Sequence, residues 1–286
     1  ADLPLNPQAF ANVSPDSAFN TAISFATNTN WQGYVGEATM SYLTQMLALA
    51  VQNFFSAATG IVVVIALIRG FARHTAKTVG NAWADLTRVT LHILLPISVV
   101  YAVFLTGQGV IQNFDAYKDV TTLEVTSFET PKLDAAGQPL KDEKGAVITE
   151  PAQTQTQTLA MGPVASQEAI KMLGTNGGGF MNANSAHPYE NPTPLTNALH
   201  ILSMLLIPSA LTYTFGSMLL RRRQGWVFFG TFLVMFIGFL SVVYSAEQSG
   251  NPLLTQAGAD QVLSAGQSGG NMEGKELRFG IADTSL

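Results

Sequence analysis

The chain has 286 residues, of which 47% are hydrophobic and 12% are charged. That charged share is about half of what soluble domains carry, so the composition is typical of a protein that lies largely in lipid. The net charge of −5 argues against nucleic acid as a partner, because binding phosphates needs a basic surface, and the lack of cysteine excludes disulfides and cysteine-ligated metals.

Residues 1–41 are predicted to form a short helix followed by a polar turn. The stretch PDSAFNTAISFA starts at Pro15 and carries Asp16 in its first turn, which is typical of a helix start. The turn that follows reads TNTNWQ, residues 27–32. The helix is too short to cross a bilayer, because a crossing takes about 20 apolar residues.

Residues 42–107 are predicted to hold two transmembrane helices, at 42–68 and 86–106, because both stretches are long and strongly apolar. The connection between them carries basic residues near its ends, namely Arg69, Arg73, Lys77 and Arg88. Short basic connections face the cytoplasm by the positive-inside rule, so we expect this loop to be cytoplasmic.

Residues 108–162 are then predicted to lie on the extracytoplasmic side. The segment holds four lysines and eight acidic residues, which agrees with that side. Its middle, LDAAGQPLKDEKGAVITEPAQTQTQT, is polar and repetitive, so we expect a flexible surface loop of low functional content.

Residues 163–197 are predicted to form a second short helix and turn. The helix starts near Pro163 in PVASQEAIKMLG, and the turn that follows contains GTNGGGF, residues 174–180. As in the first unit, the helix is too short to span a bilayer.

Residues 198–245 are predicted to hold two further transmembrane helices, at 198–220 and 226–244. The short connection between them reads RRRQG, so the positive-inside rule places it in the cytoplasm as well. Residues 246–286 then follow as an extracytoplasmic segment.

The chain therefore contains an internal repeat. Thr175 follows Thr27 by 148 residues. Three short motifs downstream each recur 152 residues later in the chain. The pairs are Leu43-Thr44-Gln45 with Leu195-Thr196-Asn197, Ser56-Ala57-Ala58 with Pro208-Ser209-Ala210, and Ile68-Arg69 with Leu220-Arg221. The second copy carries four extra residues within ANSAHPYENPTP. Each copy reads as a short helix, a turn and a full span, which is a re-entrant loop; irregular backbone at membrane depth indicates a pathway for an ion or solute.

Two functions of the GTNGGGF turn can be compared. A nucleotide loop is disfavoured, because the motif lacks the Lys-Ser/Thr of a Walker loop and follows a helix rather than a strand. A potassium filter fits better, because such filters present backbone carbonyls from a glycine-containing turn after a short pore helix. Glycine visits positive φ at little cost, and asparagine tolerates it better than most residues.

Five stretches of the chain resemble the potassium-binding subunit of the Kdp-type potassium-transporting P-type ATPase: NTAISFATNTNWQGY, GNAWADLTR, MGPVASQEAIKMLGTN, GTNGGGFMNANSAHPYENPTPLTN and GNMEGKELRFG. The resemblance implies an all-α polytopic membrane protein of the potassium-channel-like superfamily, built from repeated units of transmembrane helix, pore helix, filter loop and transmembrane helix. It further implies a multi-pass protein of the bacterial inner membrane that binds and translocates potassium. A catalytic P-type ATPase subunit, which uses ATP and Mg, and small accessory subunits would be its partners.

By the same resemblance, filter residues transfer to ten positions that would bind potassium through backbone carbonyls. They are Thr27, Asn28, Thr29, Asn30 and Gln32 in the first turn, and Thr175, Asn176, Gly177, Gly178 and Gly179 in the second. The chain starts at Ala1, just before the first turn, and GNMEGKELRFG resembles the run into a third pore helix. We therefore expect a fragment with two of four filter walls, in which the loop at 118–158 is longer than the family needs.

Other polar residues leave alternatives open. Gln52 and Asn53 fit packing between helices or a pore wall, and Glu37 and Glu190 fit cation attraction or a solvated rim. The histidines His74, His92, His187 and His200 share no metal-ligand spacing, and we find no catalytic residue set. The alternatives to a pump subunit are a gradient-driven transporter of the Trk, Ktr or HKT type and an intramembrane enzyme, which would need a catalytic pair.

Overall fold

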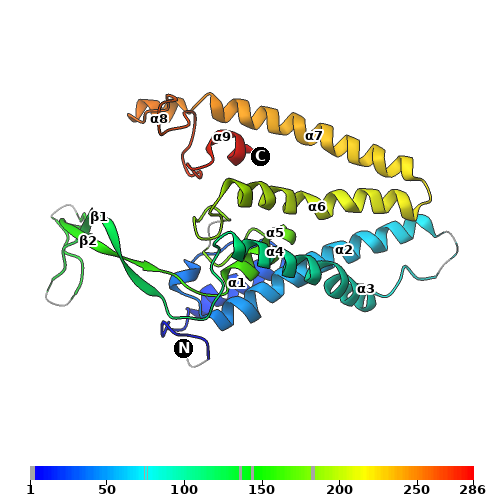
Figure 1. Cartoon of the computed structure of the whole chain (residues 1–286), viewed down its shortest axis with the longest axis horizontal. Coiled ribbons are helices and arrows are strands. Elements are labelled where there is room, and N and C mark those ends of the chain that lie inside the picture. Colours follow the sequence, from blue (N-terminus) through cyan, green and yellow to red (C-terminus); the bar gives the residue numbers. More distant parts are fainter. Residues whose placement is uncertain (1–3, 74, 76, 135–136, 143–144, 182–183) are drawn as a thin grey trace.

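The computed structural model describes residues 4–73, 75, 77–134, 137–142, 145–181 and 184–286 (Figure 1). Its helices and strands, in chain order, are α1 (Pro15–Ala26), α2 (Val51–Ala72), α3 (Ala82–Val89), α4 (Leu95–Gly107), β1 (Lys118–Pro131), β2 (Thr149–Leu159), α5 (Val164–Leu173), α6 (Pro194–Met218), α7 (Arg222–Gln248), α8 (Pro252–Gln256) and α9 (Gly280–Ser285). A π-helical stretch, Thr44–Ala50, leads into α2, and another, Thr90–Leu94, joins α3 to α4.

Within the part of the chain that the structure describes, four helical stretches are long and apolar enough to cross a membrane. They are Thr44–Ala72, Ala82–Gly107, Pro194–Met218 and Arg222–Gln256. The prediction of four spans is confirmed, with shifted ends. Arg222 and Arg223 belong to the start of α7 rather than to the connecting loop. The chain is therefore a mostly helical membrane protein.

Polar residues fix where several of these helices begin. The side chain of Ser14 accepts a hydrogen bond from the backbone N–H of Ser17 at the start of α1. Thr193 and Thr196 form a reciprocal capping box before α6. Both helices carry proline in the first turn, at Pro15 and Pro194, where the missing N–H costs nothing. These local signals explain why the predicted start of the first helix is confirmed.

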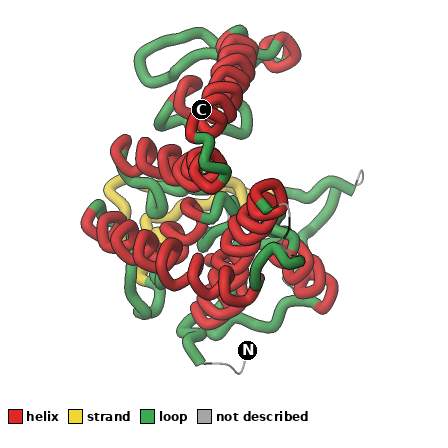
Figure 2. Tube along the Cα trace, turned by 90° about the vertical axis from the view of Figure 1, so that its right-hand side faces the viewer, coloured by secondary structure: helices red, strands yellow, loops and turns green. Residues whose placement is uncertain are grey.

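The two basic connections lie at one end of the molecule. Figure 1 shows the link from α2 to α3 and the link from α6 to α7 on the right, whereas the β1–β2 hairpin projects at the left. Figure 2 views the helices from the side of these two links, and Figure 1 shows the C-terminus between α6 and α7. A single orientation in the membrane therefore agrees with the positive-inside rule for both basic loops and with an extracytoplasmic position of the acidic segment 108–162.

The prediction of a flexible loop at 133–158 in an all-α fold is wrong. Strands β1 and β2 pair antiparallel, from Lys118 opposite Leu159 to Pro131 opposite Thr149. Both strands are rich in β-branched threonine, and β1 adds two valines; these residue types favour extended backbone even on a solvated surface. The polarity of this segment had indicated disorder, whereas its threonine content is the feature that corresponds to strands.

The root of the hairpin is anchored on the helical body. A two-stranded hairpin is marginally stable alone, but here the hydroxyl of Tyr42 donates to the carbonyl of Asp115 at 2.6 Å. The hydroxyl of Tyr117 donates to the carbonyl of Glu37 at 2.5 Å. Burial raises the pKa of Tyr42 to about 12, so this donor keeps its proton at neutral pH.

The largest buried cluster surrounds the short helix α5. Eight of its ten residues are buried, and the cluster joins Val164 and Ala169 to Tyr42, Leu105 and Phe180. By contrast, α1 buries only Thr21 and Phe25 among its described residues. The second short helix is thus enclosed by its neighbours, whereas the first lies largely at the surface.

Cysteine labelling tests the orientation. A cysteine at Gln155, which is exposed on β2, is expected to react with a membrane-impermeant thiol reagent in intact cells. A matched cysteine at exposed Thr78, in the α2–α3 connection, is expected to react only after lysis. The opposite pattern would reverse the topology.

Candidate functional site

The first polar turn continues directly from the end of α1. The backbone N–H groups of Thr29 and Asn30 both donate to the carbonyl of Ser24, at 2.9 and 3.1 Å. Asn28 and Asn30 have a φ of +58° each. Left-handed residues therefore alternate with residues of negative φ in this turn.

The second turn continues from α5 and uses the same alternation. The N–H of Asn176 donates to the carbonyl of Lys171 at 3.2 Å. Positive φ falls on Thr175, at +54°, and on Gly177, at +85°. The left-handed positions are thus two residues apart in both turns, but the second turn starts the alternation at its threonine and the first at its asparagine.

The three glycines of the second turn do not share one role. Only Gly177 of the three has positive φ. A Cβ at Gly178 would lie 2.9 Å from the Cβ of Asn30. A Cβ at Gly179 would lie 2.4 Å from the Nζ of Lys171. Gly178 and Gly179 are therefore required for space.

Side chains of the first turn bind the backbone of the second. The Nδ2 of Asn30 donates to the carbonyl of Asn176 at 2.9 Å. Gln32 bonds Gly179 twice: its Nε2 donates to the carbonyl, and its Oε1 accepts from the N–H, both at 3.2 Å. The Nδ2 of Asn176 in turn donates to the Oδ1 of Asn28. The two predicted motifs, 148 residues apart, thus form one site.

Many carbonyl groups of the site stay open. Among the described residues, no hydrogen bond reaches the carbonyl oxygens of Thr27, Asn28, Thr29, Asn30, Thr175, Gly177 or Gly178. The carbonyls of Asn176 and Gly179 instead accept the bonds from the first turn. The side chain of Gln32 therefore supports the second turn by binding the backbone of Gly179. Thr27 and Thr29 are exposed and bond each other, at 2.9 Å between hydroxyl oxygens.

Helix α2 and the stretch before it support the second turn from the side. Ser56 accepts a hydrogen bond from the Nδ2 of Asn176 at 2.9 Å. Gln45 donates to the carbonyl of Phe180 at 3.2 Å and accepts from Gln167 at 3.1 Å. Gln45 was not predicted as a site residue; the available signal was its alignment with Asn197 in the internal repeat. Asn53 is fully buried, whereas Gln52 is exposed.

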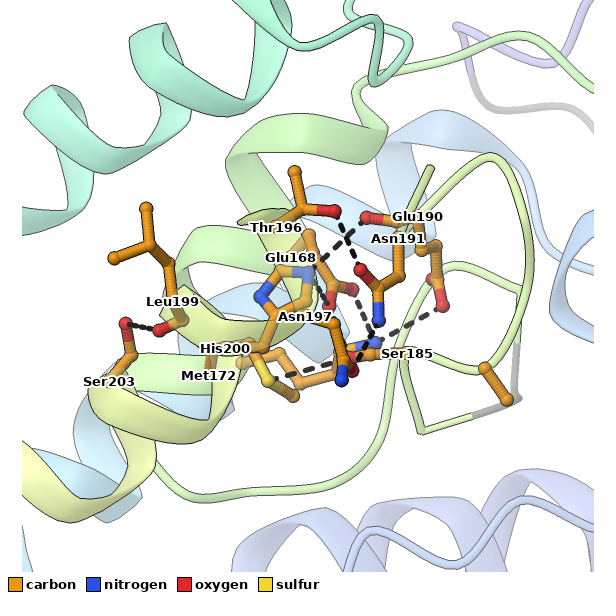
Figure 3. A network of polar contacts seen from close by, with 12 residues as sticks. Glu168, Met172, Ser185, Glu190, Asn191, Thr196, Asn197, Leu199, His200 and Ser203 are labelled. Carbon is orange, nitrogen blue, oxygen red and sulfur yellow. Dashed lines mark hydrogen bonds and ion pairs between the residues drawn. The ribbon is translucent and has the colours of Figure 1, made fainter. Parts of the chain in front are cut away.

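A buried charged cluster lies beside the second turn (Figure 3). It consists of Glu168 and Lys171 on α5 and Glu190 in the loop before α6, and all three side chains are 0% exposed. Lys171 pairs with Glu168, and its Nζ lies 3.3 Å from the Oε2 of Glu190. The solvated-rim alternative for Glu190 is therefore wrong, because apolar and polar neighbours cover it completely.

Burial and pairing shift the pKa values of this cluster in linked ways. Burial raises the pKa of Glu168 to about 7, even though Lys171 opposes that shift. Burial lowers the pKa of Lys171, but Glu168 and Glu190 outweigh it and leave the pKa raised. Burial also raises the pKa of the half-buried Glu37.

The segment after α8 packs on the loop that follows the second turn. The guanidinium of Arg278 donates to the carbonyl of Asn191 at 3.0 Å and to that of Ala186 at 2.9 Å. Asn197 donates to Asp283 at 3.1 Å. This loop contains the four extra residues of the second repeat, so the extra length has a structural partner.

The arrangement suits a weakly hydrated monovalent cation better than a transition metal. Open backbone carbonyls are the ligands that potassium filters use. Among the residues described, no group of three histidine or acidic side chains is placed to hold a metal ion. His74 lies outside the described residues.

Comparisons with known proteins match the full length of the chain to one family. The family model "KdpA: Potassium-transporting ATPase A subunit" matches residues 1–286. A protein of Dechloromonas aromatica (strain RCB) named "Potassium-transporting ATPase potassium-binding subunit" is 77% identical over 286 residues, which are all of this chain and 47% of that protein. A protein of the same name from Polynucleobacter asymbioticus is 68% identical over 284 residues, or 99% of this chain and 47% of its own length. The chain spans about half the length of these curated relatives.

Replacing Gln32 tests the link between the two turns. Gln32→Ala removes both partners of the buried Gly179 backbone, so we expect a loss of about 1–3 kcal/mol in unfolding free energy. Thermal or denaturant unfolding of the full-length protein in detergent measures the loss. Gln155→Ala, an exposed change on the hairpin, is expected to stay within about 0.5 kcal/mol. Equal stability of the two variants would mean that Gln32 does not hold the second turn.

Proposed function

Because the chain belongs to the family of potassium-transporting ATPase A subunits, we propose that its two turns form two walls of a potassium filter. In this proposal, potassium enters from the extracytoplasmic side and passes through the filter as substrate. The chain would be the channel-like subunit of an ATP-driven, high-affinity uptake complex in the bacterial inner membrane.

The open carbonyls of the two turns carry the proposal. A potassium ion that leaves water needs oxygen ligands in place of its hydration shell. Uncompensated loss of that shell is costly in a low-dielectric site. Alternating left-handed residues, at Asn28 and Asn30 and again at Thr175 and Gly177, leave seven carbonyl oxygens without protein donors among the residues described. These oxygens are available to a cation.

The remaining parts of the complex follow from the relatives. The chain corresponds to 47% of its relatives' length, and we propose that further filter walls come from the part of such proteins that it does not match. We assign ATP hydrolysis, with its Mg, to a P-type ATPase partner, and we include small accessory subunits in the complex. This chain would contribute no catalytic residue.

One measurement separates a pump subunit from a gradient-driven transporter. In vesicles that contain the complete complex, potassium uptake is expected to require ATP and to persist when ionophores abolish the proton and sodium gradients. Uptake that follows a gradient without ATP would favour a transporter of the Trk or Ktr type.

The substitution Gly177→Asp tests the role of the second turn. It places a side chain where φ is +85°, at a strain of about 1–3 kcal/mol, and adds a carboxylate near the ion path. Electrostatic attraction alone would strengthen cation binding. We expect the altered geometry to dominate, because discrimination depends on the joint placement of several carbonyls. Uptake should need on the order of tenfold more external potassium, and other alkali cations should compete better.

The matched control is Gly137→Asp. Gly137 also has positive φ, at +77°, but lies in the hairpin loop with nothing within 4 Å of a Cβ. The Gly137→Asp substitution introduces the same side chain, and a similar backbone strain, far from the two turns. Unchanged affinity and selectivity in a well-expressed Gly177→Asp complex would mean that the glycines form only a turn.

A further inference from the structure

The side chain of Lys171 packs against the second turn at Gly179. Its Nζ would lie 2.4 Å from a Cβ added to Gly179, its Cδ 2.9 Å and its Cε 3.1 Å. The stem and the ammonium of the lysine thus fill the space that any larger residue at position 179 would need. On its other side, the backbone of Gly179 is bonded by Gln32. Gly179 is therefore held between Gln32 and Lys171.

The two carboxylates connect the lysine to both ends of the turn. Glu168 lies one helical turn before Lys171 on α5 and accepts a hydrogen bond from the hydroxyl of Ser185. The Oε1 of Glu190 accepts from the N–H of Met181, at 3.0 Å, where the chain leaves the turn. Figure 3 shows Glu168, Glu190 and Ser185 converging beside α5. The charged cluster therefore joins the helix that enters the turn to the segment that leaves it.

His200, on α6, extends the cluster. Its Nε2 lies 3.5 Å from the Oε1 of Glu168, and its Nδ1 shares a hydrogen bond of 2.6 Å with the hydroxyl of Tyr101 on α4. Two transmembrane helices thus contact the cluster from the sides. Breaking a buried ion pair by removing one partner is strongly destabilising, so the lysine has little freedom to move.

The first repeat lacks charged residues at the positions equivalent to Glu168 and Lys171. The residues 148 positions before Glu168 and Lys171 are Asn20 and Ile23. Asn20 is exposed, and Ile23 is 47% exposed. The cluster therefore belongs to the second wall alone.

We propose that Lys171, held by Glu168 and Glu190, is a positioning residue that fixes the backbone of Gly179 and thereby sets which alkali cation the second wall accepts. The inference rests on the proposed filter function. The ammonium is not an ion ligand, since a cation would be repelled by it; it acts through the placement of the neighbouring carbonyls, on which alkali-cation discrimination depends.

The test uses a variant that keeps the net charge of the cluster. Lys171→Met alone would strand two buried carboxylates, whereas Lys171→Met with Glu190→Gln leaves one charge of −1, as in the native set of two carboxylates and one ammonium. In the purified full complex, we expect the half-saturating potassium concentration of ATPase activity to rise about tenfold, with maximal turnover within about twofold. Rubidium and sodium should stimulate the activity more effectively, relative to potassium.

Two further variants make the result decisive. Lys171→Arg keeps the charge but replaces a compact ammonium with a planar fork, and we expect a smaller shift in the same direction. Ile23→Met, at the equivalent site of the first repeat, is expected to change neither affinity nor selectivity. Native selectivity in either assembled Lys171 variant would overturn the proposal. Failure of both variants to assemble would overturn it too, because the role of Lys171 would then be to hold the whole subunit.

The outcome is separable from the filter proposal itself. If the native complex showed no potassium-stimulated activity, the proposed function would fail whatever Lys171 does. If Gly177→Asp altered selectivity and the Lys171 variants did not, the filter would stand and only the role of Lys171 would fall.

Discussion

Buried irregular backbone must find partners for its N–H and C=O groups, and the arrangement of the two turns follows from that requirement. The second turn is mostly buried, so its polar groups depend on side chains from elsewhere: Asn30 and Gln32 from the first turn, and Gln45 and Ser56 from the first span. The carbonyls that these donors leave unbonded are the ones that remain for an ion. A polar framework supplied by distant residues therefore decides which oxygens are free, and glycine flexibility alone would not.

Local signals in the sequence predicted the helices well. A proline and a capping serine mark the start of α1, and runs of apolar residues mark the four spans. The repeat also predicted that the TNTN and TNGGG turns share a role, and the structure brings them into contact. The hairpin was missed because its strands are almost wholly exposed, so no alternation of buried and exposed residues records their pairing.

The support of the site was harder to predict, because it depends on contacts across long stretches of sequence. Nothing near Glu190 indicates that it meets Lys171, 19 residues earlier, in a fully buried pair. The side chain of an isolated glutamate after a turn is usually solvated, so the sequence left a solvated rim open beside cation attraction and gave no sign of a buried ion pair. The four extra residues of the second repeat were visible, but their partner, Arg278, lies 87 residues beyond Asn191.

The two repeats show how one local pattern can be stabilised in two ways. Both turns place left-handed residues two apart, yet the first achieves it with asparagines and the second with a threonine and a glycine. The second has three adjacent glycines because three different constraints meet there: a left-handed backbone at Gly177, close approach of Asn30 at Gly178, and the lysine behind Gly179. The first turn is exposed at Thr27–Thr29 and has no charged cluster behind it, so a side chain at each position is tolerated. The glycine run is thus a consequence of crowding from both sides as much as of backbone conformation.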